Sequence, residues 1–104
     1  MQQQAMLRKI QKMQAEMVAT QKEIEQTVFK ASAGGVVSVE VLGTKELKSV
    51  VVSSDFEVDG PEDLEMLGDM VVAACNDAYK QIDKTTEEKM GKYQALLGGM
   101  GGLF

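Results

Sequence analysis

The chain has 104 residues, of which 44% are hydrophobic and 26% are charged, and this composition suits one small globular domain rather than a disordered chain. It contains no histidine and one cysteine, which excludes histidine-dependent catalytic triads, an internal disulfide and the usual structural zinc sites within one chain. No stretch approaches the roughly 20 continuous apolar residues of a membrane-spanning helix. We therefore expect a cytoplasmic protein that is not an enzyme and that uses no cofactor, metal, membrane or small-molecule substrate.

The formal net charge of −5 is distributed unevenly along the chain. Residues 1–30 carry five basic side chains against three acidic ones, whereas residues 31–69 carry two lysines against nine carboxylates. Acidic and basic side chains balance in residues 70–104. A pI of about 4.7 argues against a wholly basic nucleic-acid binder, but it is compatible with basic helices attached to an acidic body.

The first segment predicts one long helix with an apolar seam. From Met6 to Ile24 the less polar residues recur at spacings of four and three, as in the a and d positions of a coiled coil. A helix of about 22 residues is roughly 33 Å long. We expect this to exceed what the rest of a small domain can cover, so a second copy of the same helix is the predicted partner. The predicted dimer interface consists of Met6, Ile10, Met13, Met17 and Ile24.

The next segment alternates with a period of two, which is typical of strands. Residues 28–32 can form a short strand before the Gly34-Gly35 pair, and residues 37–41 alternate valine with polar side chains. Residues 43–46 supply a turn, and the valine-rich run at 47–53 forms a further strand. The pattern predicts an antiparallel hairpin or a three-stranded meander.

A second long helix is expected after the chain's one proline, Pro61, because the first turn of a helix has no use for the donor that proline lacks. Helical spacing of apolar residues continues from Leu64 to Ile82, and the helix is expected to end near Gly91 or to run on to Leu97. The glycine-rich residues 98–104 are expected to form a flexible tail. The predicted fold is α+β, in the order α-β-β-β-α, with a single domain over residues 1–97.

Residues 64–78, which read LEMLGDMVVAACNDA, resemble a helix of the YbaB/EbfC family of small bacterial nucleoid-associated proteins. The methionine- and glutamine-rich residues 10–17 and the lysine-rich residues 84–91 agree with the same family, and the resemblance extends from Met6 to about Gly91. It implies an α/β homodimer with long helices projecting from a central sheet. It also implies binding to double-stranded DNA with low or modest sequence preference, a location in the nucleoid, and a role in nucleoid organisation or gene expression.

The candidate DNA contacts are basic side chains on the two predicted helices. Contact with phosphate requires only positive charge within reach, and neither an arginine cluster nor an aromatic platform suggests base reading. The simpler interpretation is that these side chains only solvate exposed helix faces. The candidates are Arg8, Lys9, Lys12, Lys22, Lys80, Lys84, Lys89 and Lys92.

A different class of function is also open at this point. The methionine-rich first helix and the acidic central segment could recruit another protein, which would make the chain a protein–protein adaptor. Binding to duplex DNA at low salt would separate the two hypotheses.

Overall fold

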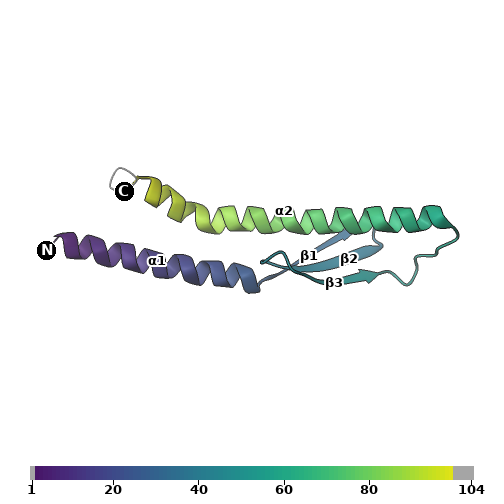
Figure 1. Cartoon of the computed structure of the whole chain (residues 1–104), viewed down its shortest axis with the longest axis horizontal. Helices are drawn as coiled ribbons and strands as arrows, with labels where there is room; N and C mark the ends of the chain where they lie inside the picture. Colours follow the sequence, from purple (N-terminus) through teal and green to yellow (C-terminus); the bar gives the residue numbers. More distant parts are fainter. Residues whose placement is uncertain (1, 100–104) are drawn as a thin grey trace.

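The computed structural model describes residues 2–99 and has the α-β-β-β-α order expected from the sequence. The molecule is a rod with extents of 74 × 22 × 16 Å, in which two helices run side by side and the sheet lies at one end (Figure 1). None of the described helices is long and apolar enough to cross a membrane. The elements are α1 (Gln2–Gln26), β1 (Val28–Ala33), β2 (Val37–Leu42), β3 (Leu47–Val52) and α2 (Pro61–Gly99).

The sheet is an antiparallel meander in the order β1-β2-β3. The β1–β2 turn places Gly34 and Gly35 at φ values of +61° and +67°, which is why two glycines occur there. The amide of Val36 closes this turn by donating to the carbonyl of Ala33 at 3.1 Å. Between β2 and β3 the register shifts near Glu40, forming a bulge.

The core lies between α2 and one face of the sheet. Alternation along β2 directs Val37, Val39 and Val41 to that face, and all three are buried. Ala74 and Ala78 of α2 are also fully buried, and their small side chains let the helix approach the strands closely. The helix packs on β1 and β2. This confirms the expected amphipathic character of the second helix.

The apolar seam of α1 faces α2 of the same chain. Ile24 and Tyr93 are 1% and 4% exposed, and the hydroxyls of Thr20 and Tyr93 lie 3.5 Å apart. The sequence-based expectation that the rest of the domain is too short to cover α1 is therefore wrong over this part of the helix. The physical reason is the length of α2, which has 39 residues and runs back beside α1.

The second helix also extends further than expected at its C-terminal end. It passes Gly91 and Leu97 and ends at Gly99, so the first two residues of the predicted tail, Gly98 and Gly99, belong to α2. The rest of that tail, residues 100–104, lies outside the described residues.

Candidate nucleic-acid interface

The eight candidate DNA-binding residues are all exposed and come from both helices. Pairing of the two helices brings the N-terminal part of α1 beside the C-terminal part of α2, although these two parts are far apart in sequence (Figure 1). The candidates fall into three groups along the rod: a cluster at the free helical end, a pair near the middle, and a pair on α2 beside the sheet.

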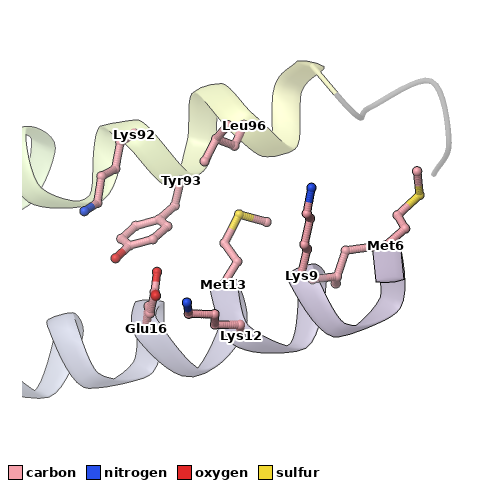
Figure 2. Close-up of a pocket in the computed structure, with 9 residues that line it drawn as sticks. Met6, Lys9, Lys12, Met13, Glu16, Lys92, Tyr93 and Leu96 are labelled. Carbon is pink, nitrogen blue, oxygen red and sulfur yellow. The ribbon is translucent and has the colours of Figure 1, made fainter. Parts of the chain in front are cut away.

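The cluster at the free end, which we call the basic tip, combines Arg8, Lys9 and Lys12 of α1 with Lys92 of α2. Three of these four residues line one groove of about 520 Å³ between the helices (Figure 2). Residues 2–15 and 89–99 together contain five basic side chains and no carboxylate. The nearest acidic side chain in this groove is Glu16, which lies beside Tyr93. The tip is therefore a locally cationic surface on an acidic protein.

The middle pair consists of Lys22 and Lys89. The ammonium of Lys89 lies 3.4 Å from a carboxylate oxygen of Glu23, so part of its charge is already compensated within the chain. Among the described residues, no carboxylate oxygen lies within 4.0 Å of the charged group of any of the other seven candidates. The ion pair between Lys89 and Glu23 is exposed and therefore weak, so Lys89 can exchange this partner for another anion.

The third pair, Lys80 and Lys84, lies one turn apart on α2. The buried positions of this helix stretch are Ala74, Ala78 and Ile82, so helical spacing places the two lysines on the side away from the sheet. The structure therefore does not gather them with the basic tip. They form a separate small cationic patch.

The end of the rod opposite the basic tip is acidic. Residues 55–69 hold seven carboxylates and no basic side chain, and they form the loop after β3 and the first turns of α2. Two lysines of the sheet region are paired, with Lys30–Glu40 at 3.8 Å and Lys45–Asp83 at 3.0 Å. Opposite charges are thus separated along a 74 Å rod.

The five residues of the predicted dimer interface all lie on the face of α1 that meets α2. Met6 is 52% exposed, whereas Ile24 is buried within its own chain. Ile10, Met13 and Met17 are half-buried. Exposure along this face thus increases from the sheet toward the tip, and its sheet-proximal end is not free for a second copy in this conformation.

The sequence correctly predicts a strand at residues 47–53, but the exposure of the apolar side chains of this strand, β3, was not predicted. Val52 lies opposite Val37 of β2, and Val50 lies opposite Val39. Val50 and Val52 therefore lie on the same face of the sheet as these two β2 valines, which is the face that α2 packs against. They are nevertheless 39% and 41% exposed, because α2 packs on β1 and β2. A signal was present, since three consecutive valines at 50–52 are apolar on both faces of a strand.

A narrow rod with cations at one end and carboxylates at the other belongs to the class of small proteins that can contact a polyanion with one part of their surface. Comparison with known proteins gives the family. The model of the YbaB/EbfC DNA-binding family matches residues 1–98, and the chain belongs to this family. This confirms the resemblance seen in the sequence and the expected nucleoid-associated, DNA-binding class of function, and the family is not one of enzymes.

Several curated relatives cover most of this chain. A nucleoid-associated protein of Lactococcus lactis subsp. cremoris (strain MG1363) is 46% identical over 91 residues, which is 86% of this chain and 90% of the relative. A nucleoid-associated protein of Chloroflexus aurantiacus is 37% identical over 105 residues, covering the whole of both chains. Nothing in these names supports the adaptor hypothesis.

The fold also matches a solved structure. The crystal structure of an uncharacterized protein from Helicobacter pylori aligns with a TM-score of 0.66 and covers 82% of this chain and 88% of its own. Its sequence identity of 22% supports the fold alone.

Proposed function

We propose that the protein binds double-stranded DNA as a homodimer, mainly through phosphate contacts, in the nucleoid of the bacterial cytoplasm, where it organises DNA and influences gene expression. The observation that carries the proposal is the basic tip, where cations from two helices meet and none has a carboxylate oxygen of the described residues within ion-pair distance. Lysine ammoniums at such a site replace the counterions condensed on DNA, which gives affinity without reading the sequence.

Charge reversal at the tip tests the DNA contact. We expect the triple variant Arg8→Glu, Lys9→Glu, Lys12→Glu to weaken binding by a similar factor on unrelated duplexes, because phosphates carry no sequence information. Neutralising the same three residues with glutamine should reduce the slope of log K against log salt by about 0.9 for each lost phosphate contact. Fluorescence anisotropy titrations at several salt concentrations measure both effects.

The matched control reverses three lysines of the sheet region, Lys30, Lys45 and Lys48, and so makes the same change in net charge. Two of these lysines already pair with carboxylates, so we expect this variant to bind DNA more tightly than the tip variant. If both triple variants lose the same affinity, net charge rather than the tip governs binding. The assignment of the tip would then be wrong.

Two observations support β3 as the main dimer contact. Its outer edge has no strand partner among the described residues, and unpaired edges can extend a sheet. Four of its six residues are apolar and at least 39% exposed: Leu47, Val50, Val51 and Val52. Antiparallel pairing of β3 with β3 of a second copy satisfies the open backbone groups and covers the valines of both copies. The projecting helices then carry two basic tips per dimer.

Sedimentation separates this interface from the helix seam. We expect the double variant Val50→Glu, Val52→Glu to sediment as a monomer at concentrations where the unmodified chain is a dimer, because each new carboxylate would be buried without a partner. The comparison variant, Met6→Glu with Met13→Glu, changes the exposed end of the α1 seam. Dissociation by this second variant alone would restore the sequence-based interface and contradict β3 pairing.

A further inference from the structure

The groove at the basic tip has an apolar floor and a basic rim. Met13 of α1 and Tyr93 of α2 point toward each other across it, and Met6 and Leu96 lie nearer the helix ends (Figure 2). Tyr93 is 4% exposed, whereas Met6 is 52% and Leu96 is 55% exposed. The basic residues along the groove are Lys9, Lys12 and Lys92. A surface that complements this groove is apolar and carries carboxylates beside its apolar side chains.

The opposite end of the rod presents such a surface at the start of α2 (Figure 1). Leu64 and Val72 are 57% and 58% exposed, and a helical rise of about 12 Å separates them. Glu65 and Asp69 are exposed beside them, on the part of the helix that helical spacing turns away from the sheet. Neither carboxylate lies within ion-pair distance of a basic side chain among the described residues. We call these four residues the acidic stripe.

We propose that the acidic stripe of a second copy of this chain docks in the groove at the basic tip. Leu64 and Val72 of the second copy then cover the exposed Met6 and Leu96, which removes apolar surface of both copies from water. This is recognition of a helix by a groove, with anchors two turns apart on the docked helix. The proposal does not depend on DNA binding.

Length and charge both match. On α1 the apolar side of the groove runs from Met6 to Met13, a rise of about 10 Å, which is close to the 12 Å rise of the stripe. This span ends before Glu16, the one carboxylate among the residues that line the groove. The carboxylates of the stripe therefore meet the lysines at the rim. Exposed ion pairs contribute little free energy each, so apolar burial supplies most of the affinity and the charges select the partner surface.

The stripe cannot reach the groove of its own chain. Leu64 and Leu96 belong to one continuous helix and are 32 residues apart, which corresponds to about 48 Å along α2. The occupant is therefore another copy. Because the groove and the stripe are different surfaces, the contact is heterologous, and repeating it joins copies head to tail. It is distinct from the pairing of β3 with β3, in which both copies contribute the same surface.

Disulfide formation between two preparations of the full-length chain tests the contact without DNA. Both preparations carry Cys75→Ala. One also carries Met6→Cys, and the other carries Leu64→Cys or Val72→Cys, because the direction of the docked helix decides which end of the stripe meets Met6. We expect the faster of these two pairs to form a disulfide at least ~10-fold faster than a control pair, since cysteines with Cα atoms more than about 7 Å apart are not bridged without backbone movement.

The control pair uses Val18→Cys in place of Met6→Cys. Val18 is 55% exposed on the same helix, which matches Met6, but it does not line the groove. If neither Leu64→Cys nor Val72→Cys reacts faster with the groove cysteine than with this control, the proposal is overturned.

Charge reversal with the same readout tests the chemistry of the contact. We expect Lys9→Glu with Lys12→Glu in the groove preparation, or Glu65→Lys with Asp69→Lys in the stripe preparation, to lower the rate toward that of the control. Both reversals together should restore it, because opposite charges again face each other. The matched control, Glu87→Lys with Glu88→Lys in the stripe preparation, makes the same change in net charge at exposed positions of α2 outside the stripe and should slow the reaction less.

Two outcomes of the charge reversals contradict the proposal. Equal slowing by the stripe reversal and by its matched control would mean that net charge, rather than the stripe, drives the encounter. Slowing by the groove reversal that the stripe reversal does not reproduce would assign the groove to a different anionic surface. Either result overturns docking of the acidic stripe.

Discussion

At Gly43, the start of the β2–β3 turn meets the end of α1, and a side chain does not fit. The amide of Gly43 donates to the carbonyl of Thr27 at 3.0 Å, which fixes the turn against the chain that leaves the helix. A Cβ on Gly43 would overlap the carbonyl carbon and oxygen of Ile24, and these backbone atoms cannot rotate away as a side chain would. One glycine therefore sets how α1 joins the sheet.

We expect Gly43→Ala to lower the free energy of unfolding by about 1–3 kcal/mol or more, because the backbone must shift to relieve the overlap. The control is Gly68→Ala on α2, where an added Cβ would meet nothing within 4 Å. Alanine there should stabilise the helix by about 0.5–1 kcal/mol. Urea unfolding followed by circular dichroism, at one fixed protein concentration, measures both changes. Equal destabilisation by the two variants would contradict this role for Gly43.

Pairing of α1 with α2 depends on a few buried contacts at the sheet end of the seam. We expect Ile24→Ala to cost about 2–5 kcal/mol of unfolding free energy, since it removes a side chain that is 1% exposed. Val18→Ala is the matched control on the same helix, because Val18 is 55% exposed, and its effect should stay within about 0.5 kcal/mol. Denaturation midpoints compare the two. A small effect of Ile24→Ala would mean that α1 is not held by α2 in solution.

The elements themselves follow from local sequence patterns, but their partners do not. Period-two valines predict β2 correctly, and the a and d spacing correctly identifies the apolar face of α1. The spacing within one helix cannot say which surface covers that face, and the contact between Glu23 and Lys89 joins residues 66 positions apart. For the same reason, the sequence names the basic candidates but cannot show that Lys9 and Lys92 share a groove. It also cannot show that α2 leaves β3 uncovered.

Over the whole molecule, the separation of charge reconciles a net charge of −5 with a surface for a polyanion. Helix α1, with 25 residues, extends about 37 Å. Its N-terminal half carries three residues of the basic tip, and its C-terminal end joins the sheet, beyond which the acidic loop lies (Figure 1). The Debye length is about 8 Å at 0.15 M salt and about 30 Å at 0.01 M. At physiological salt, DNA at the tip is therefore screened from the carboxylates of residues 55–69.

Neutralising the exposed loop with Asp55→Asn, Glu57→Gln and Asp59→Asn tests this separation, because none of these side chains forms an ion pair among the described residues. We expect affinity for duplex DNA to change by less than about twofold at 0.15 M salt and to rise clearly at 0.01 M, where the Debye length approaches the length of α1. Anisotropy titrations at both salt concentrations decide the matter. A several-fold gain already at 0.15 M would place the bound DNA beside the acidic end, because only nearby carboxylates repel phosphates through that much screening.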